Sequence, residues 1–213
     1  MNILVYTVHF MNIKKKEDDL TLGILETIER NKHVTQRHMA DELNVALGLT
    51  NSYLKRCVKK GLIKIHQAPA NRYFYYLTPK GFAEKSRLTA EYLSASFDFY
   101  RKAGSSINTI FIQCRELNFN RIMLCGISEL AEIARLKAIE AKIEITGIFD
   151  PYATTKTFIH LPVWKYIDES TEFDACVLTA LKDVDTFSHA LKEKVPINKL
   201  FIPEILPVSN RKP

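Results

Sequence analysis

The second half of the chain alternates short apolar stretches with helical segments, and this alternation limits the possible fold more than any other feature. The apolar stretches are RIMLCG, KIEITGIFD, a short one near residues 157–159, DACVLTAL and KLFIPEIL. Helical periodicity marks residues 107–117, 128–140 and 184–194. Apolar strands separated by helices are typical of a parallel sheet with helices on both faces. Residues 120–213 are therefore predicted to form an α/β domain.

The first strand of this domain leads into a turn with the spacing of a dinucleotide-binding loop. Gly126, Ser128 and Ala131 stand where such loops have a glycine for the bend, a glycine for backbone approach and a small residue. Asp150 ends the second strand, where an acidic side chain commonly accepts hydrogen bonds from a ribose diol. The predicted ligand-binding residues are Gly126, Ser128, Glu129, Ala131, Asp150, Pro151 and Thr179.

Three stretches of this half, LCGISELAEIA, ITGIFDP and LPVW, resemble the small Rossmann-like domain of bacterial sugar acyltransferases of the PglD type. The resemblance covers about residues 120–205 and implies binding of a nucleotide-sugar. LPVW (161–164) would be the loop after the third strand. Those enzymes continue into a β-helix of hexapeptide repeats, which this sequence does not have, so only ligand binding is carried over and not the acyl transfer.

The first half is basic. Residues 1–105 contain 17 Lys and Arg against 10 Asp and Glu, while residues 106–213 contain 13 against 14. The formal net charge of +6 thus comes from the first half. Such an asymmetry favours a polyanionic partner, because neutralising phosphates supplies affinity that does not depend on sequence.

The basic half also has the pattern of a winged helix-turn-helix. Leu20, Ile24, Leu25 and Ile28 form one helical stripe that ends at Asn31. Thr35 is a candidate N-cap for a second helix, and a turn at residues 44–45 leads into a third helix over about 46–60. Gly61 is expected in the left-handed conformation after that helix. Two strands, 62–65 and 73–77, then form a hairpin wing, and Thr78 and Pro79 begin a further helix.

The runs ALGLTNSYLKRCVKKGLIKI and YFYYLTPKGFAEKSRLTAEYL resemble MarR-type winged-helix regulators, especially the group associated with exopolysaccharide gene clusters. The resemblance covers about residues 20–103 and implies binding of double-stranded DNA through the third helix. On that helix, Thr50, Leu54 and Val58 are expected to face the core. Asn51 is the best candidate for reading a base, since an amide can pair with adenine, and the lysines are expected on phosphates. The predicted DNA-binding residues are Thr35, Gln36, Arg37, Leu49, Asn51, Tyr53, Lys55, Lys59 and Arg72.

The predicted organisation has four parts. Residues 1–19 form an N-terminal extension, a strand or an arm, and residues 20–85 the winged helix-turn-helix. Residues 86–119 form dimerisation and connecting helices with a short hinge at 104–106, and residues 120–213 form the ligand-binding domain. Leu88, Tyr92 or Leu93, Phe97 and Tyr100 follow one side of a helix, which favours a homodimer.

Other classes of function have little support. The four cysteines lie far apart without metal-site spacing, so they are expected to be small buried side chains in a reducing cytoplasm. No stretch has the length of a membrane span. The histidines show no catalytic partner at a recognisable spacing, so the chain is not predicted to be an enzyme.

The leading hypothesis is a dimeric, DNA-binding transcription regulator whose second domain senses a nucleotide-sugar of surface-polysaccharide synthesis. Three alternatives stay open. The chain could be a Rex-like repressor that responds to NAD(H), although the serine at position 128 counts against it. It could be a small nucleotide-sugar-modifying enzyme with an accessory winged helix. It could also be a scaffold whose Rossmann-like domain only mediates dimerisation.

Overall fold

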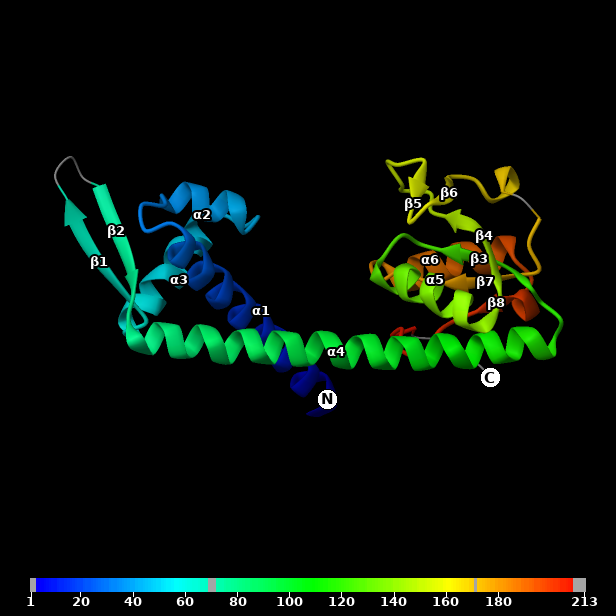
Figure 1. Cartoon of the computed structure of the whole chain (residues 1–213), viewed down its shortest axis with the longest axis horizontal. Helices are drawn as coiled ribbons and strands as arrows, with labels where there is room; N and C mark the ends of the chain where they lie inside the picture. The colour runs from blue at the N-terminus through cyan, green and yellow to red at the C-terminus, as the bar shows by residue number, and fades with distance from the viewer. Residues whose placement is uncertain (1–2, 69–71, 171, 209–213) are drawn as a thin grey trace. The chain divides into compact units, whose positions relative to one another are not determined.

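The computed structural model describes residues 3–68, 72–170 and 172–208, with the side chains of residues 3–15, 68, 72 and 169 outside the described part. The chain divides into two compact units, Met1–Ser96 and Phe97–Pro213 (Figure 1). Each unit has its own hydrophobic core. An N-terminal winged helix and a C-terminal unit with a mainly parallel sheet confirm the predicted fold class.

The first unit contains three helices, a two-stranded hairpin and the beginning of a long helix. These elements are α1 (Ile3–Arg30), α2 (Gln36–Glu42), α3 (Leu47–Lys59), β1 (Ile63–Ala68), β2 (Arg72–Leu77) and α4 (Pro79–Glu116). Strands β1 and β2 are antiparallel, with Ile63 opposite Leu77 and Ile65 opposite Tyr75. The hairpin is longer than predicted, since residues 66–68 belong to β1 rather than to the wing loop.

The helix boundaries of this unit follow the predicted local chemistry. The Thr35 side chain caps α2 by accepting a hydrogen bond from the backbone N–H of His38 (3.1 Å). Asn44 has a positive φ of 50°, which turns the chain between α2 and α3. Gly61 has a φ of 72°, as predicted for the residue after the third helix. Thr78 accepts from the N–H of Gly81 (3.0 Å) and so caps the first turn of α4.

Residues 3–19 are helical, so the prediction of a strand or an arm is wrong. Helix α1 runs without interruption from Ile3 into the stripe that begins at Leu20. Residues 3–22 contain neither proline nor glycine. With no helix breaker present, the charged run at residues 14–19 continues the helix rather than ending it.

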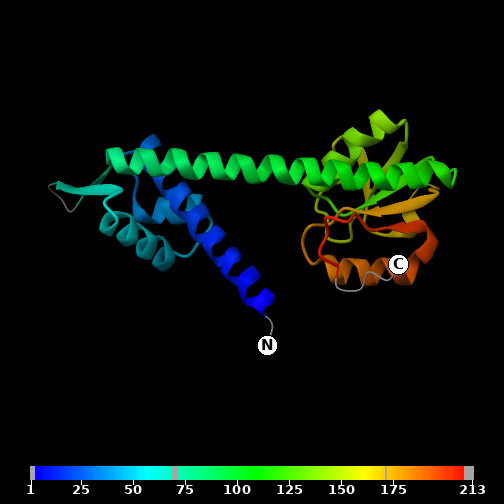
Figure 2. The ribbon, with the colours of Figure 1, turned by 90° about the horizontal axis from the view of Figure 1, so that it is seen from below.

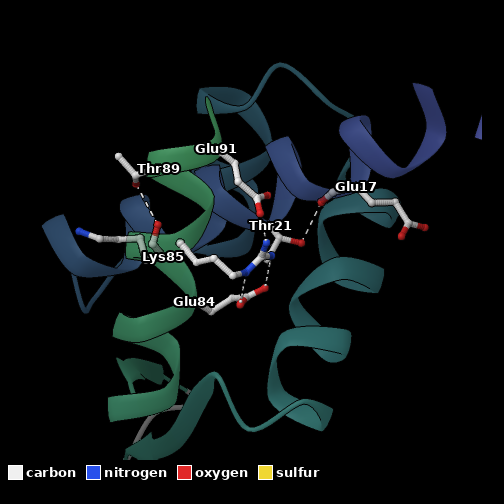
Figure 3. Close-up of polar contacts among 7 residues, drawn as sticks. Glu17, Thr21, Glu84, Lys85, Thr89 and Glu91 are labelled. Atoms are coloured by element: carbon white, nitrogen blue, oxygen red, sulfur yellow. Dashed lines mark hydrogen bonds and ion pairs between the residues drawn. The ribbon is translucent and has the colours of Figure 1, made fainter. Parts of the chain in front are cut away.

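Ion pairs join the elements of the first unit on its surface. Lys85 of α4 pairs with Glu29 of α1 (2.5 Å), and Arg56 of α3 pairs with Glu17 of α1 (2.9 Å). Within α4, Arg87 bonds both Glu84 and Glu91, which are labelled in Figure 3. The hydrogen bond from Arg87 lowers the pKa of Glu84. All of these side chains are at least partly exposed, so solvent screens the ion pairs and they contribute little to stability.

The second unit is built around a six-stranded sheet. Its elements after α4 are β3 (Arg121–Cys125), α5 (Glu129–Ala141), β4 (Glu144–Phe149), β5 (Thr157–Phe158), β6 (Leu161–Trp164), β7 (Ala175–Leu178), α6 (Val184–Lys194) and β8 (Leu200–Phe201), with short 3₁₀ turns at Ile167–Glu169 and Ile197–Lys199. The strand order is β5-β6-β4-β3-β7-β8, and among the described strand pairs of this sheet only β5–β6 is antiparallel. The chain leaves β3 first toward β4 and later toward β7, so the order reverses at β3.

Helices cover both faces of this sheet. In Figure 2, α4 and α5 lie on one side of the sheet and α6 lies on the other. The C-terminal half of α4 places Ile107, Phe111 and Cys114 in the same core cluster as the central strands. From the opposite side, Phe187 of α6 meets Phe149 of β4 edge-on, with ring centroids 6.0 Å apart. The second unit therefore has the three-layered α/β arrangement predicted from the alternating pattern.

Two sequence-based expectations about this unit are wrong in detail. The hinge expected at residues 104–106 is helical, because α4 continues through Gly104, and one glycine costs a long packed helix only about 1 kcal/mol. LPVW, expected as a loop, forms strand β6 and pairs in parallel with β4. On α5, Ile133, Ala134 and Ala138 face the core, whereas Leu136 is 51% exposed.

All four cysteines are buried and free, as predicted. Burial raises the pKa of both Cys57 and Cys114 to about 11, and that of Cys125 also rises above its ordinary range. These thiols therefore stay protonated and behave as small apolar side chains. None of the described helices is both long enough and apolar enough to cross a membrane.

Candidate nucleic-acid interface and ligand pocket

Helices α2 and α3 form a packed pair joined by a tight turn. The N–H of Val45 donates to the carbonyl of Ala40 (3.0 Å), which closes the turn. Met39 of α2 and Leu54 of α3 meet in the core with the residues of α1. This packing fixes which face of α3 points outward.

The outward face of α3 changes character along the helix. Thr50, Leu54 and Cys57 are buried, so the opposite face carries residues 48, 52, 55 and 59 at helical spacing. Lys55 and Lys59 are exposed in the last two turns, and neither forms an ion pair within the described residues. Two free cations on one helix face match a surface that meets a phosphate backbone.

The predicted residues of α3 do not share one environment. Leu49 is exposed, as expected for a residue facing outward, and Val58 is only half-buried. Tyr53 is half-buried and lies against Arg56, with the guanidinium 5.3 Å from the ring centroid. Asn51 is also half-buried, and its Oδ1 atom has neither solvent access nor a partner in the described part of the chain. The amide of Asn51 thus lies at the flank of the helix rather than at the centre of the exposed face.

At the start of α2, only one of the three predicted residues has a free side chain. Arg37 is exposed and makes no ion pair among the described residues. Thr35 is engaged as the cap of α2, and the amide of Gln36 donates to the Tyr75 hydroxyl (3.2 Å). The side chain of Arg72, predicted at the wing, lies outside the described residues.

Sequence analysis missed Gly48 and Ser52, which lie at the centre of the exposed face of α3. Ser52 makes no hydrogen bond within the described chain. A signal was available, because both residues share the four-residue spacing of Lys55 and Lys59 on a helical wheel. Neither side chain is charged or long, so the residue types alone gave no indication of a contact with DNA.

In the second unit, the turn after β3 is closed by glycine and serine. Gly126 has a φ of 107°, and an added Cβ would lie 2.5 Å from the Cβ of Ala180. Ser128 is the N-cap of α5, since its Oγ accepts from the N–H groups of Leu130 (3.1 Å) and Ala131 (3.4 Å). The same hydroxyl donates to the carbonyl of Thr179 (2.5 Å). The Ser128 hydroxyl therefore holds the turn through three hydrogen bonds to backbone groups.

The ends of β3 and β7 are tied together beneath the turn. The Thr179 hydroxyl donates to the carbonyl of Gly126 (2.6 Å), and this hydrogen bond is fully buried. Together with the bond from Ser128, it links the turn to β7 in both directions. Thr179, Gly126 and Ala131 are all buried, so they support the backbone of the turn and do not line its surface.

Asp150 connects the turn to the loop after β4. Its Oδ2 accepts from the N–H of Ile127 and its Oδ1 accepts from the N–H of Tyr152, both at 2.9 Å. Each oxygen keeps a second lone pair for a further donor. The carboxylate thus joins the loop after β4 to the turn after β3, and its predicted contact with a ribose stays a prediction.

A pocket of about 540 Å³ opens above this turn, at the carboxyl ends of β3, β4 and β7. This is the place where the strand order reverses, which is where open α/β sheets commonly bind ligands. The predicted residues Ser128, Glu129 and Asp150 line it, and Pro151 does not. The full lining is Ile127, Ser128, Glu129, Glu132, Asp150, Tyr152, Phe158, Ala180, Leu181, Lys182, Asp183, Thr186 and Phe187.

The pocket combines apolar walls with a charged rim. Lys182 supplies the cation, and Glu132 and Asp183 supply exposed carboxylates. Asp183 has a left-handed φ of 48° at the start of α6. The backbone N–H groups of Ser128 and Glu129 have no acceptor among the described residues, so the turn offers two donors to a bound anion or carbonyl.

No group of three or more His, Cys, Asp or Glu side chains in the described part of the chain could hold a metal ion.

Residues 17–64 match the family model described as winged helix-turn-helix DNA-binding. This segment has the fold of a winged helix-turn-helix. The match begins within α1, includes α2 and α3, and ends in β1. It therefore contains the whole exposed face of α3 described above.

Solved structures similar to the chain include a MarR family transcription regulator, SP03579, with 20% identity and a TM-score of 0.36, over 46% of this chain and 73% of that chain. The Staphylococcus aureus MepR–DNA complex is 19% identical at a TM-score of 0.35, over 44% of this chain and 75% of that chain. Human N-acetylserotonin methyltransferase in complex with SAM is 11% identical at a TM-score of 0.28, over 84% of this chain and 71% of that chain. A comparison with the curated proteins found no match. The resemblance of residues 120–205 to PglD-type domains stays a prediction.

Proposed function

We propose that this protein is a transcription regulator of the MarR type that binds double-stranded DNA through α3. One observation carries the proposal: the segment that matches DNA-binding winged helices presents Lys55 and Lys59 on the outward face of α3, without partners among the described residues. The excess of basic residues in the first half supports the same conclusion. A chromosomal partner would place the protein in the cytoplasm of a bacterial cell.

Binding to a labelled duplex at several salt concentrations tests this proposal. We expect an affinity that falls steeply with salt, because lysines at phosphates release counterions on binding. Selection from random duplexes should then enrich a sequence in two related halves. A full-length protein without salt-sensitive affinity for duplex DNA would contradict the proposal.

The proposal includes a ligand in the pocket of the second unit, and its class is a nucleotide-sugar. The N–H groups of Ser128 and Glu129, together with Lys182, suit the phosphates. The exposed carboxylates of Glu132 and Asp183 suit sugar hydroxyls, since they are hydrogen-bond acceptors. NAD(H) is the second candidate, although the Ser128 side chain occupies the point where NAD-binding loops have glycine.

Thermal-shift titrations with UDP-sugars, CMP-sugars, NAD(H) and coenzyme A test this part. We expect stabilisation by one nucleotide-sugar, which Lys182→Ala should weaken at least tenfold. Lys165→Ala is the matched control, because Lys165 is exposed in the same unit but does not line the pocket. Stabilisation by none of these compounds would remove the sensor from the proposal and leave DNA binding intact.

A homodimer is also proposed, and its support is the apolar surface of α4. Tyr92, Leu93, Phe97 and Tyr100 are all exposed, whereas Leu88, predicted on the same stripe, is buried in the first unit. Isolated apolar side chains on a surface are ordinary, but this helix presents several at helical spacing. Sedimentation of the wild type and of Phe97→Ser should show a dimer that the substitution weakens.

Ligand and DNA would be coupled if the ligand bound one arrangement of the dimer more tightly than the other. The measurement is DNA affinity with and without the stabilising compound. Reciprocity requires that DNA change the affinity for the ligand by the same factor. We propose no chemical reaction for the pocket.

A further inference from the structure

The first half of the exposed face of α3 is uncharged and small, in contrast to the two lysines that follow it. Gly48 and Ser52 form its centre, and Leu49 lies beside them one turn from Ser52. If this face of α3 contacted only phosphates, we would expect Lys or Arg at positions 48, 49 and 52 as well. The composition therefore indicates a partner that approaches closely and has an apolar part.

Nothing in the described part of the chain requires glycine at position 48. Its backbone is helical, and an added Cβ would meet nothing within 4 Å. Glycine in a helix is less favourable than alanine by roughly 0.5–1 kcal/mol, so the residue weakens the helix without relieving any crowding. Close approach of an external molecule at this point explains the missing side chain.

Leu49 is 39% exposed and does not belong to the core of the first unit. Ser52, on the same face, has a hydroxyl without a partner in the described chain. In the major groove, the apolar feature of a base pair is the 5-methyl group of thymine, and serine can bond any base edge. The residues near the N-terminus of a recognition helix are also those that contact bases.

We propose that the protein reads the 5-methyl group of a thymine through Leu49, with Gly48 allowing close approach and Ser52 bonding the neighbouring base edge. Lys55 and Lys59 then lie on the flanking phosphates. This inference rests on the proposed DNA-binding function and gives it a base preference. The role of Asn51, which lies at the flank, becomes secondary.

The test replaces single thymines of the selected duplex by uracil, which removes only the methyl group. With the wild-type full-length protein, we expect affinity to fall about fourfold at one thymine of each half-site, the value of one buried methyl-sized group. With Leu49→Ala, the thymine and uracil duplexes should bind equally. Leu47→Ala is the matched control, since Leu47 is exposed to a similar degree but lies off this face, and it should keep the fourfold difference.

Gly48→Ala provides a second measurement that does not depend on removing a side chain. We expect specific affinity to fall at least tenfold, while the melting temperature stays the same or rises. The inference is overturned if uracil has no effect at any thymine, if the uracil effect survives in Leu49→Ala, or if Gly48→Ala binds the selected site like the wild type. The inference is also overturned if the protein binds duplex DNA but enriches no sequence, whereas the loss of all salt-sensitive affinity for duplexes would contradict the DNA-binding function itself.

Discussion

The carboxylate of Asp150 accepts a hydrogen bond from the backbone N–H of Ile127, with 2.9 Å between Oδ2 and the nitrogen. This bond joins the loop after β4 to the turn after β3, across the floor of the pocket. The spacing of Asp150 in the sequence predicts a contact with a ligand. The structure shows that Asp150 also holds the turn to which that ligand would bind.

Asp150→Ala should therefore destabilise the second unit before any ligand is considered. The substitution leaves the N–H groups of Ile127 and Tyr152 without their acceptors, and an unpaired, partly buried donor costs about 1–3 kcal/mol. Urea denaturation followed by circular dichroism measures the loss. Asp150→Asn keeps one carbonyl oxygen and should lose less; equal midpoints for wild type and Asp150→Ala would contradict this account.

Two glycine substitutions should have opposite effects on stability. Gly126→Ala forces a side chain into a backbone with φ 107° and against Ala180, so we expect a loss above about 1 kcal/mol. Gly48→Ala places a methyl group in open space on a helix and should leave stability unchanged or raise it by up to about 1 kcal/mol. Thermal denaturation of both variants checks the pair, and a stable Gly126→Ala protein would show that the turn relaxes easily.

Stability at acid pH should depend on Asp174. Its Oδ2 accepts from the backbone N–H groups of Arg121 and Asn120, both at 2.8 Å, and these bonds lower the pKa of the carboxyl in the folded protein. In the unfolded chain the pKa is about 3.9. The stabilisation is therefore complete above about pH 4 and is lost as the pH falls through the lower, folded-state pKa.

Asp174→Asn should reduce the difference in unfolding free energy between pH 6 and pH 3, measured by urea titration at each pH. Asp168→Asn is the control, since Asp168 is an exposed carboxylate without a hydrogen bond in the described part of the chain. If both variants kept the acid sensitivity of the wild type, the two backbone bonds of Asp174 would not be its source.

Lys55→Ala should lower DNA affinity at all sequences alike. A phosphate contact releases about one counterion, so the slope of log affinity against log salt should become shallower by roughly 1. Lys59→Ala should behave in the same way, because both side chains are exposed on the same face. A loss confined to the selected sequence would instead place the lysine on a base.

Local patterns in the sequence predicted most of the fold. Thr35, Asn44 and Gly61 mark helix ends through their own backbone and side-chain chemistry, so they were recognisable without tertiary information. The hinge at residues 104–106 could not be judged in this way, because tertiary packing of α4 against the sheet overrides the weak helix propensity of Gly104 and two serines.

The candidate pocket was only half predictable. Ser128 and Glu129 belong to a turn with a known spacing, Asp150 follows the next strand at the expected distance, and the structure brings the three together. Lys182 and Asp183 come from the segment after β7, which has no such pattern. They join the pocket only because β7 lies beside β3, and strand order is set by long-range packing rather than by local sequence.

The C-terminal half of α4 has a practical consequence for anyone dividing the chain. A fragment starting at residue 120 would begin neatly at a strand, yet it would lack Ile107, Phe111 and Cys114, which are almost completely buried on the sheet. It would also lose Ser106, whose hydroxyl accepts from the N–H of Glu204 (2.6 Å). Such a fragment would expose one face of its own core and aggregate, whereas a fragment that begins before Phe97 keeps that face covered.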